Sequence, residues 1–326
     1  MNKILVIQTA SIGDVILATP VVEKLHRFFP DAQIDLLVKK GNETLFAGHP
    51  FLHEVHVWDK QSDSLFIFAK LVSHVRNARY DLVVNLQRFL KTGLMTAFSG
   101  AGMTIGFDKN PVSFLFTRKI SHKLNGIHEI RRNLALIEEI TDNSTEKPML
   151  YPSPGDYLQV ASLKTFCYYT MSPASLWFTK QYPMEKWVDL VKCVPPGASV
   201  YLLGAGSDHS LCEEIISLAA HPGVNNLAGK LTFLQSAALM QDAKMNFTND
   251  SAPMHLASAV NAPVTAIYCS TIPGFGFGPL SDDSQVAEIA NELYCRPCGL
   301  HGYRSCPEKH FRCALDIRVE QLQARL

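Results

Sequence analysis

The sequence predicts an α/β protein with two domains, each built around a parallel β-sheet. Two patterns predict it. Short apolar runs alternate with amphipathic helical stretches in both halves of the 326-residue chain, and a polar, proline-rich segment separates the halves. Hydrophobic residues make up 47% of the chain and charged residues 18%, which supplies two cores and excludes a disordered protein.

Both halves predict strands followed by helices. In the first half, 4–8, 34–38, 53–58 and 81–86 predict strands, and 15–29, 64–80 and 127–141 predict helices. In the second half, 167–171, 199–203, 245–248 and 264–269 predict strands, and 184–193, 209–220, 233–241 and 253–260 predict helices. Segment 142–155 has the composition of a linker, so we place the domains at 1–150 and 151–326.

Charge and hydropathy narrow the class of protein. The formal net charge is zero, which argues against a nucleic-acid-binding protein. The apolar run at the N-terminus ends at Gln8 and is too short for a signal peptide, and no stretch approaches the roughly 18 apolar residues of a membrane span. We therefore expect a cytoplasmic protein, one that can contact the cytoplasmic membrane peripherally from its inner face.

The first candidate motif is segment 9–20, which follows the first predicted strand. Gly13 and its small neighbours allow a tight turn, and Asp14 stands where the next helix begins. One interpretation is that Asp14 only caps this helix, because Asp is a common cap residue. The other is that its carboxylate is a general base, since ligands of such sheets bind beyond the carboxyl ends of the strands.

The second candidate motif is segment 247–257, in which three residues that favour helix caps precede Pro253. Free N–H groups and the helix dipole at such a point favour an anion such as phosphate. Asp250, Ser251 and Ala252 would form this turn, with His255 beside it. A well-capped helix without a ligand, and a structural role for His255, are the alternatives.

Two further segments follow predicted strands in the second half. Lys180 lies ahead of a proline-started helix and is either a point charge for a phosphate or a solvated surface lysine. In segment 204–209, two glycines allow a ligand to approach the backbone, and Asp208 could accept a hydrogen bond from a ribose. The segment lacks the third glycine of the dinucleotide fingerprint, so a plain strand–turn–helix corner is its alternative.

Together these motifs resemble glycosyltransferase family 9, the heptosyltransferases. The resemblance rests on Gly-Asp-x5-Pro at 13–20, Thr-Lys-x-x-Pro at 179–183 and Thr-Asn-Asp-Ser-x-Pro-Met-His-Leu-Ala at 248–257. Segments 85–88, 105–108, 128–134 and 226–230 also resemble family segments. The resemblance therefore runs in order along nearly the whole chain.

The resemblance implies a GT-B fold, in which two Rossmann-like domains face each other across a cleft. The N-terminal domain is expected to bind the acceptor and the C-terminal domain the nucleotide sugar. The expected reaction is inverting transfer of heptose from ADP-heptose to the lipopolysaccharide inner core. Asp14 matches the family's proposed base, Lys180 a residue that contacts the donor diphosphate, and 250–252 the donor-binding turn.

Such a transfer needs a base for the acceptor hydroxyl and a positive group for the departing diphosphate. Lys180 and a helix N-terminus supply the positive group without a metal ion, and the sequence contains no Asp-x-Asp pair. We therefore expect a metal-independent glycosyltransferase that requires no cofactor for catalysis.

Basic residues dominate the stretch from Arg76 to Arg132, which holds ten basic and three acidic residues. This excess predicts a positive field suited to an anionic lipopolysaccharide core, or else a scattered solvated surface. Arg88 and Lys91 follow a predicted strand and are the expected acceptor contacts. Ser11 and Gly13 of the first motif are also assigned to acceptor binding.

A C-terminal segment, 295–313, carries the cysteines Cys295, Cys298, Cys306 and Cys313. The Cys-x-x-Cys pair can place two thiolates on one ion, and the other two cysteines would complete a structural zinc site. His301 and His310 are alternative ligands. Reduced or redox-active thiols are the alternative, because standard zinc spacings have two close pairs.

Two positions near the predicted donor site depart from the family pattern. Ala252 stands where glycine is usual, and Ser270-Thr271 replaces the common Gly-Pro-Thr. They leave open a transferase that uses another nucleotide sugar or acceptor. An NAD-dependent oxidoreductase and a non-catalytic binding protein are less favoured, because the glycine turn is incomplete and both Asp14 and Lys180 are present.

Overall fold

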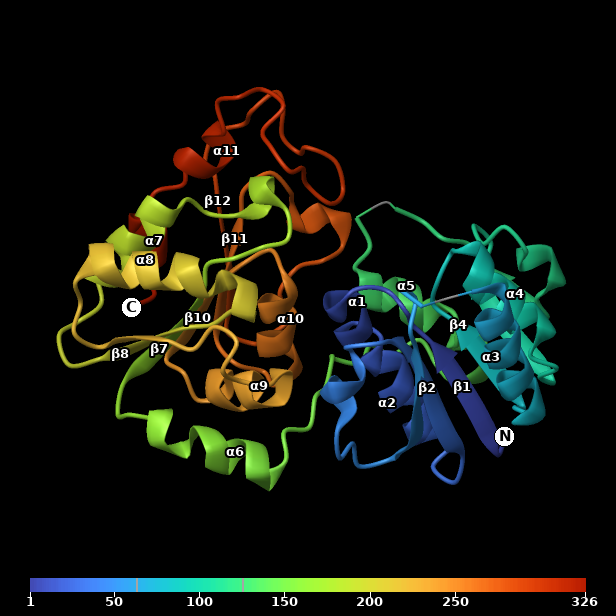
Figure 1. Cartoon of the computed structure of the whole chain (residues 1–326). Helices are drawn as coiled ribbons and strands as arrows, with labels where there is room; N and C mark the ends of the chain where they lie inside the picture. The colour runs from blue at the N-terminus through green and yellow to red at the C-terminus, as the bar shows by residue number, and fades with distance from the viewer. Residues whose placement is uncertain (63, 125) are drawn as a thin grey trace. The chain divides into compact units, whose positions relative to one another are not determined.

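The computed structural model describes residues 1–62, 64–124 and 126–326, and the chain divides into two compact units. The N-terminal unit is Met1–Tyr151 and the C-terminal unit is Pro152–Leu326, one residue from the boundary that the linker composition suggests. Helices cover the sheet of each unit (Figure 1). In the described part of the chain, no helix has both the length and the apolar character needed to cross a membrane.

The described residues of the N-terminal unit form a six-stranded parallel sheet in the order β3-β2-β1-β4-β5-β6. The strands are β1 (Lys3–Ile7), β2 (Gln33–Lys39), β3 (Leu52–Trp58), β4 (Leu82–Asn85), β5 (Met103–Phe107) and β6 (Arg118–Ile120). In the central strand, Ile4 is in register with Ile34 on one side and Leu82 on the other. All the strands therefore end at one edge of the sheet, where the loops that carry candidate residues gather.

One helical prediction in this unit is wrong. The helices are α1 (Ile12–Ile16), α2 (Thr19–Phe28), α3 (Leu65–Asn77), α4 (Leu90–Phe98) and α5 (Glu129–Ala135). The single helix predicted over 15–29 breaks after Ile16, because Pro20 has no N–H to bond the Ile16 carbonyl. The hydroxyl of Thr19 donates to that carbonyl instead, at 2.7 Å.

Other elements differ from the sequence pattern in smaller ways. The helix predicted over 127–141 ends at Ala135 and is followed by a 3-10 turn at Glu138–Ile140. The apolar pattern did not predict α4, β5 or β6. Gly93 interrupts the apolar pattern of α4 and Gly106 that of β5, and β6 is only three residues long.

The core of the N-terminal unit lies between the sheet and the helices α3 and α4. Its buried members are Leu5, Ile7, Leu37, Trp58, Val75, Tyr80, Val83 and Met95. The strand members alternate along β1, since Leu5 and Ile7 face this side. The sheet is therefore a rigid base for the turns that follow its strands.

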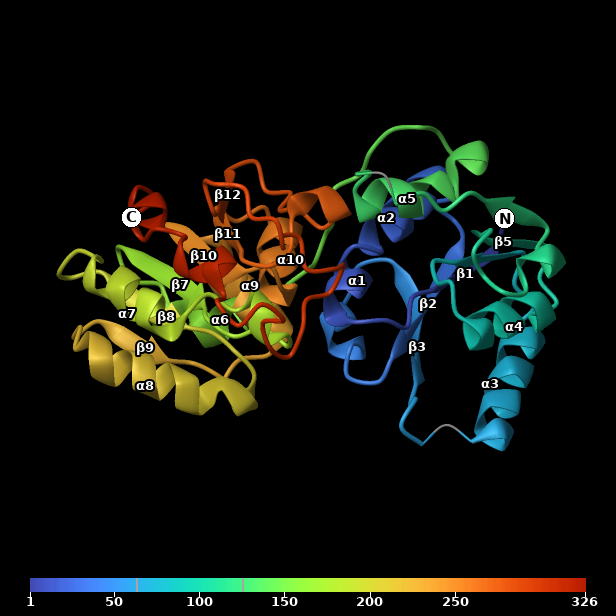
Figure 2. The same ribbon diagram turned by 90° about the horizontal axis from the view of Figure 1, so that it is seen from above.

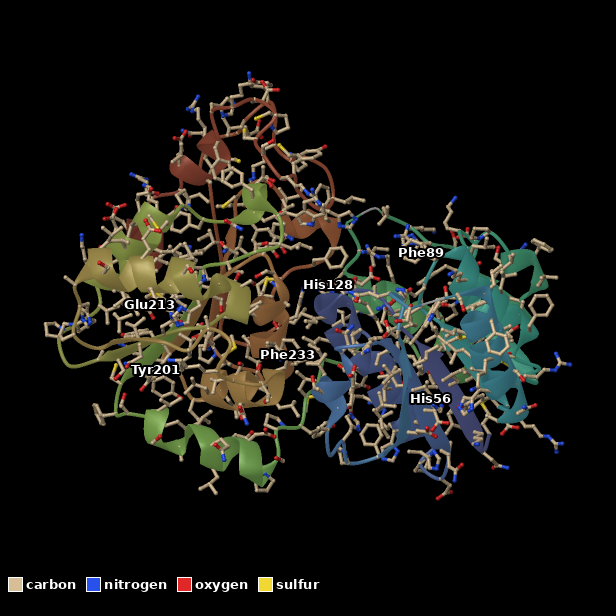
Figure 3. The ribbon with its side chains drawn as sticks, viewed as in Figure 1. His56, Phe89, His128, Tyr201, Glu213 and Phe233 are labelled. Atoms are coloured by element: carbon tan, nitrogen blue, oxygen red, sulfur yellow. The ribbon has the colours of Figure 1, made fainter. Side chains whose placement is uncertain are left out.

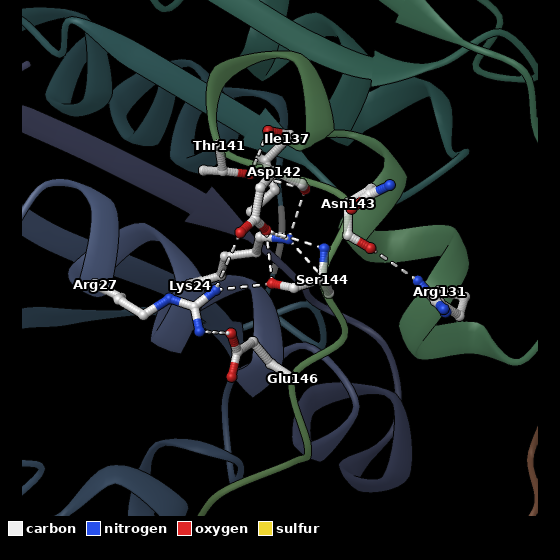
Figure 4. Close-up of polar contacts among 9 residues, drawn as sticks. All are labelled: Lys24, Arg27, Arg131, Ile137, Thr141, Asp142, Asn143, Ser144 and Glu146. Atoms are coloured by element: carbon white, nitrogen blue, oxygen red, sulfur yellow. Dashed lines mark hydrogen bonds and ion pairs between the residues drawn. The ribbon is translucent and has the colours of Figure 1, made fainter.

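A buried lysine fixes the segment that leads out of this unit (Figure 4). The Lys24 side chain on α2 is fully buried, and its Nζ donates to the carbonyl oxygens of Asp142 at 2.6 Å and Ser144 at 2.7 Å. The same Nζ lies 2.6 Å from the Asp142 carboxylate. Nearby, Arg27 pairs with Glu146 at 2.5 Å. Part of the predicted linker is thus bound to the N-terminal unit.

Replacement of Lys24 by Met is expected to lower the free energy of unfolding of this unit by about 2–4 kcal/mol, because it leaves the partly buried carbonyl groups of Asp142 and Ser144 without their donor. Urea unfolding of the full chain would measure the loss. Lys39→Met, at an exposed position on β2, is the control and should stay within about 0.5 kcal/mol of wild type. Equal stability of the two variants would contradict this role for Lys24.

The described residues of the C-terminal unit form a second six-stranded parallel sheet, in the order β12-β11-β10-β7-β8-β9. The strands are β7 (Tyr168–Ser172), β8 (Ser199–Leu202), β9 (Val224–Asn226), β10 (Met245–Asn249), β11 (Val264–Tyr268) and β12 (Ser284–Glu288). Four of these strands, β7, β8, β10 and β11, match predicted runs. Their carboxyl ends are neighbours at one edge, so the loops after them meet there.

Helices cover both faces of this sheet. They are α6 (Pro154–Val160), α7 (Met184–Lys192), α8 (His209–Ala219), α9 (Phe233–Gln241), α10 (Ala252–Ala259), α11 (Arg312–Leu315) and α12 (Glu320–Gln323). The pair α7 and α8 packs together, and α9 packs with α6 and α10 (Figure 2). The core on the α7–α8 side includes Trp187, Phe247 and Ile317, so the chain after the cysteine segment returns to the core.

Candidate active site

Asp14 lies in α1, directly beyond the carboxyl end of β1. Its Oδ2 accepts hydrogen bonds from the Ser11 hydroxyl at 2.5 Å and from the Ser11 N–H at 3.2 Å. The carboxylate therefore caps its own helix, as one of the two interpretations predicts. Within residues 1–62, 64–124 and 126–326, no hydrogen bond uses Oδ1 of Asp14, and the side chain is half-buried. The second oxygen is thus in a position to accept a proton from a substrate.

The turn before Asp14 is held by residues from neighbouring loops. Gln87, after β4, accepts from the Thr9 hydroxyl at 2.9 Å and donates to the side chain of Gln8 at 2.5 Å. Lys60, after β3, donates to the Thr9 carbonyl at 2.7 Å. Because Gln8 and Gln87 are buried, these bonds fix the backbone from which Asp14 projects. Gly13 is buried within α1 and is not among the positive-φ glycines of the described chain, so the tight turn expected at this residue is a helical turn.

Two buried charged residues of α5, Glu129 and Arg132, influence the electrostatics around Asp14. His128 (Figure 3) caps α5, and Glu129 follows it. Arg132 pairs with Glu129 through Nε at 2.8 Å and Nη2 at 2.5 Å. Burial raises the pKa of Glu129, which Arg132 opposes and the charge of Asp14 reinforces. Glu129 therefore lies within electrostatic range of the candidate base.

Positive charge gathers beside the carboxylates of Asp14 and Glu129. The pKa of His122 is lowered to about 4 by burial and then by the charges of Arg88 and Arg132. Arg88, a predicted acceptor contact, is exposed beyond β4. Lys91, the other one, is exposed in the first turn of α4, where its Nζ lies 5.7 Å from the centre of the Phe68 ring. The edge of the N-terminal sheet thus combines a half-buried carboxylate with a cationic surrounding.

In the C-terminal unit, the structure brings together Lys180 and Asp250. Lys180 follows β7 and Asp250 follows β10, and Lys180 Nζ lies 2.7 Å from Asp250 Oδ2. The hydroxyl of Thr271, after β11, donates to the same oxygen at 2.6 Å. All three side chains are largely buried. Asp250 therefore orients Lys180, and its carboxylate is engaged by the protein itself.

The helix that follows Asp250 begins without a side-chain cap. Ser251 is the N-cap residue of α10, but its hydroxyl donates to the Asn249 carbonyl at 3.3 Å and does not cap the helix. Ala252 is the first residue of α10, and its φ is not positive. The glycine that is usual at this position is therefore not required. His255 is buried within α10. Pro253 has no N–H and the Met254 N–H donates to the Ser251 carbonyl at 3.1 Å, so the N-terminus of α10 offers an anion the N–H groups of Ser251 and Ala252 and the positive end of the helix dipole.

Arg296 holds the loop after β11 and was not predicted. Its guanidinium donates to the carbonyl oxygens of Cys269 at 2.8 Å and Thr271 at 2.7 Å, and pairs with Glu288 at 2.6 Å. Since Thr271 bonds Asp250, a chain of contacts runs from Arg296 to Lys180. Arg296 is therefore a positioning residue for the Lys180 site.

The same cysteine segment also touches the loop that carries Lys180. Tyr303 N–H donates to the Thr179 hydroxyl at 2.7 Å, and Thr179 N–H donates to the Tyr303 carbonyl at 3.1 Å. A side chain at Gly302 would lie 2.9 Å from the Thr179 hydroxyl, so only glycine fits there. The Cys segment, residues 295–313, thus supports the Lys180 site at two points, through Arg296 and through Tyr303.

With the ADP-linked donor that the family resemblance implies, replacement of Arg296 by Ala is expected to weaken binding of ADP about tenfold. Thr271 and Asp250 lose their support, and each bond to a charged group contributes about 1.5–3 kcal/mol. Arg312→Ala, which removes an exposed pair with Asp316 in the same segment, is the control. Thermal unfolding separates this from loss of fold. Unchanged ADP affinity in folded Arg296→Ala would remove Arg296 from the site.

Asp208 has a local structural role. Its Oδ2 accepts from the Ala205 N–H at 2.8 Å, and the side chain fills the space in which a Cβ at Gly204 would stand. Gly229, with φ of +74°, packs against Gly206 so closely that a Cβ there would lie 2.7 Å from the Gly206 Cα. Packing against Asp208 therefore explains Gly204, whereas a Cβ at Gly206 would meet nothing within 4 Å. The ribose contact of Asp208 stays a prediction.

The structure does not assemble the predicted zinc ligands. All eight cysteines are free, and within residues 1–62, 64–124 and 126–326 no group of three or more His, Cys, Asp or Glu side chains is arranged to hold a metal ion. Cys298 Sγ donates to the Cys295 carbonyl at 3.0 Å, and Cys295 Sγ lies 3.8 Å from His310 Nε2. The pKa of Cys313 is raised to about 12 by burial and by the neighbouring cysteines. The thiols of Cys295 and Cys298 thus contact an imidazole and a backbone carbonyl, respectively.

The sequence model of glycosyltransferase family 9 (heptosyltransferase) matches residues 68–306. Lipopolysaccharide heptosyltransferase 2 of Escherichia coli is 26% identical over 99% of this chain and 97% of its own, and lipopolysaccharide heptosyltransferase 1 of Pseudomonas aeruginosa is 26% identical over 98% and 92%.

A solved structure shows the same fold. The structure of E. coli ADP-heptose lps heptosyltransferase II aligns with a TM-score of 0.80 at 23% identity, over 99% of this chain and 97% of that one. The GT-B fold class predicted from the sequence is confirmed, with one parallel α/β unit in each half.

Proposed function

The chain belongs to glycosyltransferase family 9 (heptosyltransferase), and on this premise we propose that it transfers heptose from ADP-heptose to the lipopolysaccharide inner core, with inversion and without a metal ion. The observation that carries the proposal is Asp14, whose carboxylate is fixed by Ser11 beyond the carboxyl end of β1. The names of the relatives from Escherichia coli and Pseudomonas aeruginosa support the acceptor.

In the proposed reaction, an acceptor hydroxyl oxygen attacks the anomeric carbon of the heptose. Asp14 removes the hydroxyl proton as the new C–O bond forms. The bond from the anomeric carbon to the diphosphate oxygen breaks, and ADP leaves with the bonding electrons. Attack from the side opposite the leaving group inverts the anomeric centre.

The departing diphosphate is proposed to bind at Lys180 and the N-terminus of α10. Lys180 supplies a localised positive charge, and the helix supplies N–H groups and the positive end of its dipole. Asp250 holds the Lys180 side chain in place at 2.7 Å before the donor binds. This arrangement stabilises the charge of the leaving group from groups of the protein alone.

The acceptor is proposed to bind at the basic edge of the N-terminal sheet. After burial, the charges of Arg88 and Arg132 lower the pKa of His122 at this edge. Phosphate and carboxylate groups of a lipopolysaccharide core suit such a field. Ser11, which holds Asp14, is exposed at the same turn.

Structural zinc in the Cys segment also stays a proposal. Cys295, Cys298, Cys306 and Cys313 would have to turn their thiols toward one ion, because they are not so arranged in the structure. Elemental analysis of protein purified without oxygen tests it. One zinc per chain, lost in Cys298→Ser, would support the site, and protein free of zinc would exclude it.

Calorimetric titration with ADP, UDP, GDP and NAD in the presence of EDTA tests the donor assignment. The proposal predicts that ADP binds and that the other three bind at least about tenfold more weakly, a difference of 1.4 kcal/mol. A preference for UDP or GDP would agree with a glycosyltransferase but would assign it another nucleotide sugar as donor. Binding of NAD alone would contradict the proposal.

A further inference from the structure

Exposed apolar side chains gather on three loops of the N-terminal unit. They are Leu65 and Phe66 at the start of α3, Phe89 and Leu90 at the start of α4, and Phe114 and Leu115 in the 3-10 turn after β5. Leu65 and Phe66 are 84% and 78% exposed. We call these six residues the apolar surface. Contiguous exposed apolar groups on a folded chain mark an interaction site.

The three loops adjoin one another. Lys91 at the start of α4 lies over the ring of Phe68 in the first turn of α3, at 5.7 Å. At the other end of the same helices, Arg76 donates to the Phe98 carbonyl at 3.4 Å. The helices α3 and α4 thus lie side by side with their N-termini together, and Phe89 is labelled in Figure 3.

The third loop is tied to the second. The Asn110 side chain donates to the Phe89 carbonyl at 3.0 Å and accepts from the Val112 N–H at 3.1 Å. A Cβ at Gly93 of α4 would lie 2.1 Å from the Asn110 side chain, so the loop lies directly on this helix. Because the loops follow β3, β4 and β5, they emerge at the edge of the sheet that carries Asp14.

Positive charge surrounds the apolar surface. Lys70, Arg88, Lys91 and Lys109 lie within or next to the same loops, and all are exposed. From residue 59, where the loop after β3 begins, to residue 124 the sequence has ten basic and four acidic residues, Asp59, Asp63, Asp81 and Asp108. Asp59 pairs with Lys40 at 2.8 Å. Asp81 accepts a hydrogen bond from the Asn2 N–H at 2.6 Å and lies at the amino end of the strands, opposite to this edge. Asp108 accepts a hydrogen bond from the His122 N–H at 2.9 Å. The field at this edge is therefore positive.

We propose that the apolar surface docks on a lipid bilayer that contains anionic phospholipids. The leucine and phenylalanine side chains enter the boundary between headgroups and acyl chains, and the lysine and arginine side chains contact lipid phosphates. A protein partner would also cover apolar groups, but the surrounding basic residues favour a surface of dense negative charge. This proposal goes beyond the proposed transfer reaction, because docking needs neither donor nor acceptor. It would place Asp14 on the side of the unit that faces the lipid.

Co-sedimentation of the full chain with vesicles tests the proposal. Vesicles of phosphatidylglycerol and phosphatidylethanolamine should bind the protein, and vesicles of phosphatidylcholine should bind it at least about tenfold more weakly, since each lysine or arginine near an anionic surface contributes about 1 kcal/mol. Binding should fall as salt is raised. Equal binding to both vesicles, or no binding to either, would overturn the proposal.

Substitutions test whether vesicle binding depends on the apolar surface or on any exposed apolar side chain. Leu65→Ser combined with Phe66→Ser should weaken vesicle binding at least about tenfold, since burying one such side chain is worth about 1.5–3 kcal/mol. Phe114→Ser, on another loop, is a second variant that does not alter α3. The matched control is Leu158→Ser combined with Phe166→Ser, two exposed apolar residues of the C-terminal unit. A control that loses binding as strongly would overturn the assignment to this surface.

Two further measurements keep the outcomes distinct. Size-exclusion chromatography without lipid should show one species for wild type and the Leu65/Phe66 variant, and a dimer that only wild type forms would mean that a second copy covers the surface. ADP binding by the variant should equal that of wild type, because these residues lie outside the candidate active site. Failure of transfer with intact vesicle binding would contradict the proposed function and leave the docking proposal standing.

Discussion

Asp14→Asn is expected to lower turnover by about 10²–10⁴-fold, because a general base contributes this much to proton transfer and an amide cannot accept the proton. The variant should fold normally. An amide oxygen can still accept the hydrogen bonds that Ser11 donates to Asp14 at 2.5 and 3.2 Å. Initial rates of ADP release from ADP-heptose in the presence of acceptor measure the effect, and ADP affinity by calorimetry should be unchanged.

The chain offers a matched control for this substitution. In α6 the same motif recurs: Asp156 accepts from the Ser153 hydroxyl at 2.7 Å and from the Ser153 N–H at 2.8 Å. Asp156→Asn should therefore reproduce the change in helix capping without any change in turnover. If Asp14→Asn retains more than a tenth of wild-type turnover, or if both variants lose equally, Asp14 serves as a helix cap and the base must be sought elsewhere.

Lys180→Ala should weaken binding of ADP by about tenfold to a hundredfold, since a hydrogen bond to a charged group is worth about 1.5–3 kcal/mol. Removal of the ammonium group also leaves the Asp250 carboxylate, formerly 2.7 Å away, as a negative charge near the expected phosphates. Calorimetric titration with ADP measures the affinity. Lys186→Ala, a lysine of α7 a short distance along the chain, is the control and should bind ADP like wild type.

A double-variant cycle separates the two roles of this pair. If Asp250 acts by holding Lys180, Asp250→Asn should weaken ADP binding in the wild-type background and should not weaken it further in Lys180→Ala. Full affinity in the double variant would show that the anion site is formed by the helix N-terminus without the lysine. Independent, additive losses would mean that Asp250 contacts the donor itself.

Local sequence patterns predicted the sheet edges and the residues that gather there. The strands β1 and β4 contain apolar runs that are readable from sequence, and β7 and β10 are buried throughout although they include polar residues. The polar residues after these strands fall at the ends of parallel strands. Asp14 shows the limit of this approach. Its sequence position could not separate a cap from a base, and the structure shows that one carboxylate oxygen can cap while the other stays available.

Contacts between distant parts of the chain could not be predicted. Arg296 supports Thr271 from 25 residues away, and Tyr303 supports Thr179 from 124 residues away, neither of which a local pattern encodes. Glu129 and Arg132 resemble exposed helix residues by type, although their i,i+3 spacing allows a pair. The cysteine spacing suggested metal binding, but the described structure uses this segment as a brace for the Lys180 loop.

The most direct test of this account is transfer by the purified full chain, with EDTA present, from ADP-heptose to a lipopolysaccharide core that lacks the heptose. Mass spectrometry of the acceptor and NMR of the new linkage would be read together. We expect addition of a single heptose with an inverted anomeric centre, at a rate that EDTA does not change and that Asp14→Asn lowers by about 10²–10⁴-fold. Transfer with retained configuration, or transfer only from another nucleotide sugar, would contradict it.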